Sequence, residues 1–342
     1  MSRRTVFVAL QQFCETDPKP LHVLSEAGCA VRQNTLGRRL RREEMVPLLR
    51  EVDAVIAAVE PYDAELLAAL PRLRLISRCG TGTDAIDLEA ARRLGVTVTT
   101  TPDETVEPVA QMAVTMILAL ARNVPQHLAE FRAGRWVKHS GFLLSEWTVG
   151  IVGFGRIGRA VERYLRAFGP RILVADPALG ERDVPDSVVR CSFPTLLAEA
   201  DVITLHAGRD PKEGALIGSR ELRMMKRGAY LVNTSRGFLV DEESLREALD
   251  TRHLAGAALD VFSQEPYVGP FTQSPHVLGT PHVATLTRAS RAAMELRCAK
   301  NVVDFFSPRT QEAPCVRGSQ SAASIQPEGQ VDVPIVPRGV AS

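Results

Sequence analysis

The chain has 342 residues, of which 45% are hydrophobic and 24% charged, so it is long enough for two domains with cores of their own. Its 41 Lys and Arg residues against 40 Asp and Glu leave a net charge of +1, which predicts no nucleic-acid partner. The longest apolar helical pattern, Val109 to Ala121, contains Gln111 and is too short to span a membrane, so we expect no membrane partner.

Over the first hundred residues, short apolar strands alternate with helices, which predicts a parallel sheet covered on both faces. The expected strands are Val6–Leu10, Ala30–Arg32, Ala54–Ala57, Leu73–Ser77 and Val96–Thr99, and the expected helices are Lys19–Ala27, Arg42–Glu51, Ala64–Leu70 and Leu88–Leu94. Thr101-Pro102-Asp103 then breaks the pattern. The apolar helix from Glu107 should form a bridge into a second unit.

The second unit repeats the alternation of strands and helices. Its expected strands are Val149–Val152, Ile172–Ala175, Val202–Leu205, Tyr230–Asn233, Gly256–Leu259 and Val277–Gly279. A last helix, Arg288 to Phe306, is apolar enough to pack back on the first half. Beyond Pro308 the chain is rich in Ser, Gln, Pro and Gly without periodicity, so we expect residues 316–342 to be disordered.

A glycine-rich turn follows the first strand of the second unit. Gly153-x-Gly155-x-x-Gly158 opens a helical pattern, and the next strand ends in Asp176, 18 residues past Gly158. Strand, triplet, helix, strand and acid together form the dinucleotide-binding fingerprint, in which the phosphates meet the positive end of the helix. The Asp176 carboxylate can accept the ribose hydroxyls and would repel a 2'-phosphate, and no basic residue follows at Pro177-Ala178. The cofactor should therefore be NAD rather than NADP.

Polar side chains follow three later strands of this unit. Arg236 comes after one strand, Asp260 and Glu265 after the next, and His282 after the last. Ligands of open parallel sheets bind beyond the carboxyl ends of strands, so we expect these groups to converge beside the dinucleotide.

These residues, with the loop Ser77-Arg-Cys-Gly-Thr-Gly-Thr-Asp-Ala-Ile-Asp87, carry a resemblance. From about Val6 to Pro314 the chain resembles the D-isomer-specific 2-hydroxyacid dehydrogenases, and the D-3-phosphoglycerate dehydrogenase-like branch is nearest. The resemblance implies an α/β fold of two doubly wound parallel-sheet domains. These are a flavodoxin-like substrate domain, residues 1–102 plus 286–315, and a Rossmann NAD-binding domain, residues 103–285. It also implies a homodimer through the NAD-binding domains, with residues 131–145 as an arm.

The resemblance also implies a role for each site residue. His282 would exchange the proton of the hydroxyl group at C2, Glu265 would hold the imidazole ring, and Arg236 would bind the α-carboxylate and polarise the carbonyl. Asp260 would accept a hydrogen bond from the nicotinamide carboxamide. The substrate loop would contribute Gly80, Thr81 and Gly82, and the cofactor would be bound by Gly153, Gly155, Arg156, Ile157, Gly158, Asp176, His206, Thr234, Ser235, Asp260 and His282.

Departures from the family pattern leave the substrate open. Gly208 and Arg209 follow His206 where a proline is usual two residues on, and Thr83 and Ala85 change the substrate loop. The substrate is a small 2-oxo or 2-hydroxy acid, with or without a phosphate or phosphonate that Arg78 or Arg209 would bind. Two other functions stay open: an NAD(H)-sensing, non-enzymatic protein of the corepressor type, and a phosphite-type dehydrogenase on the same fold.

Cysteine usage and the N-terminus bear on the compartment. The six cysteines have no paired spacing, and the N-terminal residues lack the apolar region of a signal peptide. We therefore expect a cytoplasmic protein with reduced thiols. His, Cys and acidic residues show no metal-ligand spacing, so we expect no metal site.

Overall fold

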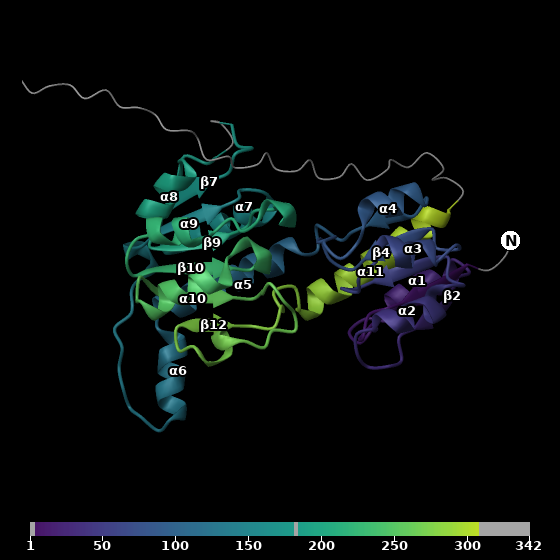
Figure 1. The fold of residues 1–342 in the computed structure, drawn as a ribbon, viewed down its shortest axis with the longest axis horizontal. Helices are drawn as coiled ribbons and strands as arrows, with labels where there is room; N and C mark the ends of the chain where they lie inside the picture. The colour runs from purple at the N-terminus through teal and green to yellow at the C-terminus, as the bar shows by residue number, and fades with distance from the viewer. Residues whose placement is uncertain (1–3, 181–183, 308–342) are drawn as a thin grey trace, which may run out of the picture.

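The computed structural model describes residues 4–180 and 184–307. They form two α/β units that lie side by side, each built around one parallel sheet (Figure 1). The chain passes between the units twice, first into helix α5 (Val106–Ala121) and finally along α11 (Arg288–Phe306). The predicted disordered tail, residues 316–342, lies outside the described residues.

The smaller unit contains a five-stranded sheet in the order β2-β1-β3-β4-β5, which is the flavodoxin-like order that the resemblance implied. Two of its helices have an aspartate as their N-cap residue. The side chain of Asp63 accepts a hydrogen bond from the amide of Leu66, and that of Asp87 accepts one from the amide of Ala90. The strands are β1 (Thr5–Val8), β2 (Ala30–Gln33), β3 (Ala54–Ala57), β4 (Leu75–Arg78) and β5 (Thr97–Thr99), and the helices are α1 (Lys19–Glu26), α2 (Arg42–Leu49), α3 (Ala64–Ala68) and α4 (Leu88–Arg93).

The larger unit contains a seven-stranded sheet in the order β12-β11-β10-β9-β6-β7-β8, and every pairing is parallel. The strand order reverses between β6 and β9, and such a switch point is where doubly wound sheets bind ligands. The strands are β6 (Thr148–Val152), β7 (Arg171–Ala175), β8 (Val188–Arg190), β9 (Val202–Leu205), β10 (Ala229–Asn233), β11 (Leu254–Leu259) and β12 (Val277–Gly279). The helices after α5 are α6 (Val124–Arg132), α7 (Arg156–Leu165), α8 (Phe193–Glu199), α9 (Ser219–Met224) and α10 (Glu242–Asp250).

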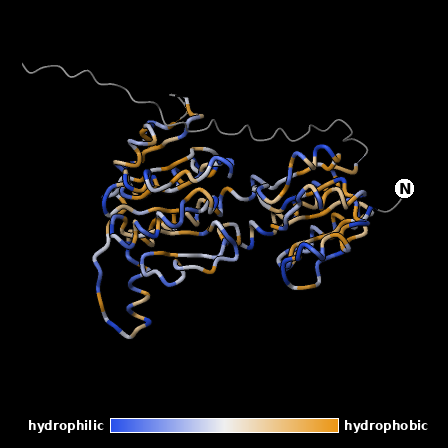
Figure 2. The backbone as a smooth tube through the Cα atoms, viewed as in Figure 1, coloured by the Kyte–Doolittle hydropathy of each residue, from blue (hydrophilic) through white to orange (hydrophobic). Residues whose placement is uncertain are grey.

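Helix α11 returns to the smaller unit. Its Met294, Cys298 and Val302 are buried in the same core as Val8 of β1 and Leu75 of β4. Helix α11 therefore completes the cover of the five-stranded sheet. The domain limits expected from the sequence stay a prediction. Figure 2 shows the hydrophobic stretches gathered inside both units, where the strands run. Within the described residues, no helix is both long and apolar enough to cross a membrane.

Two elements differ from the sequence-based expectation. Strand β8 was not predicted, because it has only three residues, of which two are exposed. Helix α6 was not predicted either, and none of its side chains is buried. The other strands lie within two residues of their predicted bounds.

Candidate active site

The glycine-rich turn joins β6 to α7 at the switch point of the larger sheet. Gly153 has a φ of +88°, and a Cβ there would lie 2.6 Å from the carbonyl of His206. A Cβ at Gly158 would lie 2.2 Å from the carbonyl oxygen of Gly153, so both positions require glycine. At Gly155, by contrast, no atom lies within 4 Å of the Cβ position. The turn is therefore packed on the protein side and open where a pyrophosphate would approach.

Helix α7 presents free amides beside this open space. Gly155 is its N-cap, and no side chain caps its first turn. Uncapped amides at a helix N-terminus, together with the helix dipole, favour a phosphate. The side chain of Arg156 is ion-paired with Asp103, so the predicted contribution of Arg156 to the pyrophosphate site would come from its backbone. Ile157 is half-buried in the same first turn.

Asp176 lies at the end of β7, beside the glycine-rich turn. Its Oδ2 accepts from the amide of Phe154 at 2.7 Å, and its Oδ1 accepts from the amide of Ala178 at 2.9 Å. These two bonds fix the carboxylate next to the turn, and carboxylate oxygens have further lone pairs for ribose hydroxyls. The position fits a cofactor whose ribose carries hydroxyls rather than a phosphate.

Two buried polar atoms near the ends of β9 and β10 have no hydrogen-bond partner among the described residues. They are Nδ1 of His206 and Oγ1 of Thr234. Buried polar groups are normally hydrogen-bonded, so these two atoms point to a missing ligand. Burial lowers the pKa of His206 to about 3, so the ring is neutral, and its Nε2 lies 2.9 Å from Oγ1 of Thr204. The side chain of Ser235, in contrast, is already used, because its Oγ donates to the carbonyl of Leu205.

His282 and Glu265 meet at the ends of the neighbouring strands β11 and β12. Nδ1 of His282 lies 2.7 Å from Oε2 of Glu265, and the carboxylate must accept this bond. The imidazole ring therefore presents Nε2 to any ligand. His282 has a φ of 54°, a left-handed conformation that non-glycine residues rarely adopt and that is common at functional sites.

Asp260 holds the backbone around His282 in this conformation. Its carboxylate accepts from the amides of Val283 and Ala284 at 2.8 and 2.9 Å, and from Oγ1 of Thr280. The Asp260 side chain is fully buried, with 0% of its surface exposed. The structure thus places Asp260 as an anchor of the histidine loop, and its predicted contact with the nicotinamide carboxamide stays a prediction.

Arg236 reaches from the end of β10 to the smaller unit. Its Nε donates to Oδ2 of Asp84 at 2.6 Å, and its Nη1 donates to the carbonyl of Ser235 at 2.7 Å. A Cβ at Gly82 would lie 1.8 Å from Nη2 of Arg236, so the guanidinium group sits directly against the loop after β4. Sequence reasoning gave no role to Asp84, although its carboxylate only two residues after Gly82 was the available signal.

The loop after β4 is held from outside by polar contacts. The amide of Gly80 donates to Oγ1 of Thr101 at 2.8 Å, and Oγ1 of Thr81 bonds to Oγ1 of Thr105 at 2.7 Å. In the part of the chain that the structure describes, the amides of Thr81 and Gly82 donate to no protein acceptor. The loop thus offers free donors beside Arg236, which suits a carboxylate.

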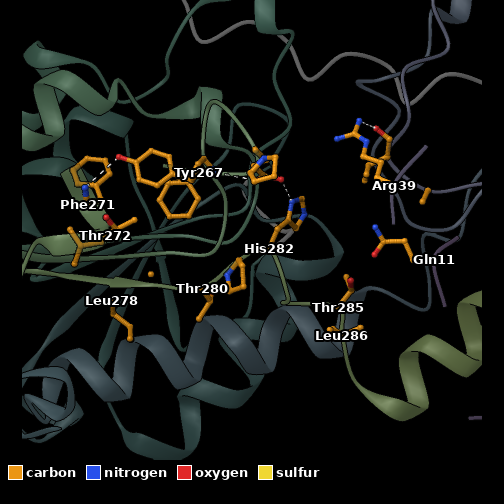
Figure 3. Close-up of a pocket in the computed structure, with 18 of the residues that line it drawn as sticks. Gln11, Arg39, Tyr267, Phe271, Thr272, Leu278, Thr280, His282, Thr285 and Leu286 are labelled. Carbon is orange, nitrogen blue, oxygen red and sulfur yellow. Dashed lines mark hydrogen bonds and ion pairs between the residues drawn. The ribbon is translucent and has the colours of Figure 1, made fainter. Parts of the chain in front are cut away.

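A cavity of about 1070 Å³ opens beside the histidine. Figure 3 shows His282 between one side that carries Tyr267 and Phe271 and another side that carries Arg39 and Gln11. Arg236 and the loop residues Gly80, Thr81 and Gly82 do not line this cavity. The charge of Arg236 nevertheless contributes to lowering the pKa of Glu265, so the two groups are near one another.

The structure separates the two arginines that could bind a second anionic group. Arg78 lines the cavity together with His282, and its Nε donates to the carbonyl of Gly82 at 3.1 Å. Burial lowers its pKa from the ordinary arginine value, and the buried carboxyl of Glu60 lies close enough to oppose that shift. Arg209 lies outside the cavity lining and pairs with Glu213 at 3.4 Å. Of these two arginines, Arg78 is therefore the one placed to meet a group next to His282.

Comparison with protein families gives one match. Residues 114–284 match the family described as "D-isomer specific 2-hydroxyacid dehydrogenase, NAD binding domain". A glyoxylate reductase of Thermococcus litoralis is 36% identical over 77% of this chain and 83% of its own length. A D-3-phosphoglycerate dehydrogenase of Archaeoglobus fulgidus is 34% identical over 84% of this chain, which spans only 55% of that protein.

Solved structures show the same arrangement. A glyoxylate reductase from Paecilomyes thermophila, 29% identical, superposes with a TM-score of 0.79 over 88% of this chain and 95% of its own. A D-lactate dehydrogenase from Aquifex aeolicus, complexed with NAD and lactic acid, is 27% identical and has a TM-score of 0.77 over 88% of this chain and 95% of its own.

Proposed function

The chain belongs to the D-isomer specific 2-hydroxyacid dehydrogenase family, and we propose the substrate side and the residues of its reaction below. As a member it is an NAD-dependent oxidoreductase that acts on CH–OH groups and reduces 2-oxo acids in the reverse direction. We propose that it makes and uses the D-hydroxy acid. The observation that carries the proposed oxidoreductase reaction is the 2.7 Å contact between Nδ1 of His282 and Oε2 of Glu265 at the edge of the cavity.

NAD, when bound, supplies or accepts the hydride. In reduction, His282 donates the proton from Nε2 to the carbonyl oxygen, and in oxidation it removes the hydroxyl proton. Glu265 holds the ring through Nδ1 and stabilises its protonated form. Arg236 binds the α-carboxylate together with the free amides of Thr81 and Gly82, and its charge polarises the reacting carbonyl.

We further propose that the substrate carries a second polar or anionic group beyond C2. Arg78 lines the cavity with His282. Arg39 and Gln11 line it as well, together on one side of His282 (Figure 3). A phosphate or phosphonate would gain two guanidinium groups there, but it would also meet the buried carboxyl of Glu60. Because the cavity lining carries both positive and negative groups, it suits a small substrate. Whether the substrate carries a phosphate is therefore the question that the experiment must answer.

The test is a panel of 2-oxo acids with NADH, followed at the nicotinamide absorbance. Glyoxylate, hydroxypyruvate and 3-phosphohydroxypyruvate form a series in which only the group beyond C2 changes. Chiral chromatography of the product should give the D-hydroxy acid. NADH binding without reduction of any oxo acid would favour the NAD(H)-sensing function, and oxidation of phosphite would favour the phosphite-type enzyme.

We also propose a homodimer through the larger unit. The segment from α6 to the start of β6 carries exposed apolar side chains, which are Val124, Leu128, Phe131, Trp136, Val137, Phe142 and Leu143. Such a concentration of exposed apolar side chains in one segment is typical of a protein–protein interface. Light scattering should give a mass near twice the chain's 37.3 kDa. The cytoplasm stays our proposal for its compartment, supported by five free cysteines among the described residues.

The preference for NADH over NADPH should depend on Asp176. Its carboxylate would lie against the 2'-phosphate of NADPH, and such like-charge contacts cost several kcal/mol. A difference of about 1.4 kcal/mol in binding free energy changes the affinity tenfold. We expect Asp176→Ala combined with Pro177→Arg to narrow the ratio of kcat/KM for the two cofactors at least about tenfold. Asp186→Ala, which removes an exposed acid of the same unit, is the control. Equal use of both cofactors by the wild type would contradict this role.

Asp84 should position Arg236 for the substrate carboxylate. Asp84→Ala removes the acceptor of Nε, and because both side chains are partly exposed we expect a loss of about 1 kcal/mol, or roughly fivefold. The loss should appear as a higher KM for the oxo acid with kcat little changed. Asp84→Asn keeps an acceptor oxygen and should recover most of it, while Glu89→Gln serves as an exposed control. A lower KM in Asp84→Ala would show instead that Asp84 competes with the substrate.

The pH profile should depend on Glu265. Burial acts to raise the pKa of Glu265, but the hydrogen bond and charge of His282 outweigh it, so the pKa lies below its ordinary value. Because the pKa of Glu265 is lowered, its ionic hydrogen bond with His282 is fully present at pH values above the ordinary glutamate pKa of about 4.3. The bond is lost as the pH falls through the lower pKa that Glu265 has in the folded protein. Acid loss of reductase activity should therefore begin below about pH 4.3.

Glu265→Gln keeps a hydrogen-bond acceptor for His282 but removes its charge. We expect the upper limb of the kcat/KM profile for reduction to move to lower pH, because the protonated ring loses its counter-ion. Glu247→Gln, at an exposed position of α10, should leave the profile in place. An unshifted upper limb in Glu265→Gln would argue against the electrostatic role.

A further inference from the structure

Two cysteines meet beneath the loop that follows β4. Cys79 stands between β4 and Gly80, and Cys298 lies in the middle of α11. Their thiols lie close enough for each to shift the pKa of the other, and both side chains belong to one buried core. A second bond joins the same places, because Oγ of Ser77 donates to the carbonyl of Cys298 at 3.2 Å. The two thiols are therefore neighbours in one core, although they lie far apart in the sequence.

Only one of these two cysteines lines the cavity beside His282. Cys79 lines the same cavity as His282 and is 7% exposed, whereas Cys298 is fully buried behind it. A small molecule that enters the cavity thus meets Cys79 first. Cys298 is then the neighbouring thiol that can react with a modified Cys79.

The surroundings of Cys79 favour its thiolate. The hydrogen bond from Cys298 lowers the pKa of Cys79 against the effect of burial, and the guanidinium groups of Arg291 and Arg78 lower it further. Burial raises the pKa of the partner thiol, Cys298. Cys14 and Cys191 also differ from Cys79, because burial raises the pKa of Cys14 to about 11 and raises that of Cys191. The thiolate is the reactive form of cysteine, so Cys79 differs from these two.

We propose that Cys79 and Cys298 form a reversible disulfide when a peroxide enters the substrate cavity, and that this bond switches off substrate binding. The Cys79 thiolate attacks one peroxide oxygen, which gives a sulfenic acid and releases the other oxygen as water after proton uptake. The sulfur of Cys298 then attacks that of Cys79. The S–S bond forms, the S–O bond breaks, and the hydroxide leaves as water with the Cys298 proton. Two thiols are oxidised by two electrons, and one hydrogen peroxide is reduced to two waters.

The bond would move the substrate loop. A disulfide has an S–S length of about 2.05 Å, much shorter than any non-bonded contact of two thiols, so Cys79 must move towards α11. Gly80 is bonded directly to Cys79, and the guanidinium group of Arg78 donates to the Cys79 carbonyl. The free amides beside Arg236 would therefore shift. The glycine-rich turn after β6 belongs to the other sheet, so NADH binding should persist.

The experiment treats the full chain with hydrogen peroxide, alkylates the remaining thiols and analyses the peptides by mass spectrometry. We expect a peptide pair linked through Cys79 and Cys298, a rise of at least about tenfold in the oxo-acid KM (or about 1.4 kcal/mol), and unchanged NADH fluorescence titration. A dithiol should restore the KM. Cys191→Ser is the matched control and should behave like the wild type.

Cys298→Ala removes the resolving thiol from the core without touching the cavity. We expect it to form no linked pair and to carry sulfenic or sulfinic acid at Cys79, with a loss that a dithiol no longer fully reverses. Cys298→Val gives a second variant should the alanine variant unfold. Two unmodified thiols after peroxide treatment would overturn the proposal, and so would a linked pair with an unchanged KM. The linked peptide needs no substrate for its detection, so its absence is distinguishable from a failure of the proposed reaction.

Discussion

Replacing His282 with alanine should lower kcat for 2-oxo acid reduction by about 10²- to 10⁴-fold, the usual contribution of a general acid or base. The reason is geometric. His282 is fixed through Nδ1 by Glu265 at 2.7 Å, and its backbone is fixed by the buried carboxylate of Asp260. The remaining nitrogen, Nε2, is then the atom that can exchange a proton with the substrate.

This variant should leave cofactor binding nearly intact. The glycine-rich turn and Asp176 lie at β6 and β7, away from the histidine loop after β12. NADH fluorescence titration should therefore give a dissociation constant close to that of the wild type, while rapid-mixing kinetics give the chemical step. His276→Ala is a matched control, because His276 lies at the start of β12 outside the cavity around His282. A His282→Ala enzyme with near wild-type kcat would rule out the proton-transfer role.

The inner strands of both sheets, such as β3, β6 and β9, could be predicted because they are buried and read as short apolar runs. The order of site residues along the chain also carried spatial information. Glu265 and His282 follow strands that pair directly in the structure, β11 and β12, so their contact follows from the parallel topology alone. Helix α6 was not predicted, although Val124, Leu128 and Phe131 stand at helical spacing along it.

Two contacts between segments that are distant in the sequence could not be predicted. The bond of Arg236 to Asp84 and the contact of Cys79 with Cys298 each join segments whose relative position no periodicity encodes. The same holds for the choice between Arg78 and Arg209. Sequence patterns give the side of a strand or helix that is buried, but the cleft between the units depends on how α5 and α11 connect them.

Arg236→Lys should be nearly as damaging as the loss of His282, although it keeps the charge. The guanidinium group already donates from Nε to Asp84 and from Nη1 to the carbonyl of Ser235, which leaves Nη2 directed at the loop beside Gly82. A lysine ammonium is a single point of charge and cannot keep these anchors while it binds a carboxylate.

Hydrogen bonds to charged groups contribute about 1.5–3 kcal/mol each, so losing one bond to the carboxylate corresponds to roughly 10- to 150-fold in kcat/KM. If Arg236 binds the carboxylate in the ground state, KM rises, and if it also polarises the reacting carbonyl, kcat falls as well. We expect both in steady-state assays with the best oxo acid of the panel. Arg246→Lys, at an exposed ion pair of α10, controls for the loss of a guanidinium group elsewhere. An unchanged kcat with a raised KM would limit Arg236 to substrate binding. Unchanged values of both kcat and KM would contradict a role of Arg236 in the site, where it is the group of the described residues that bonds to the Asp84 carboxylate.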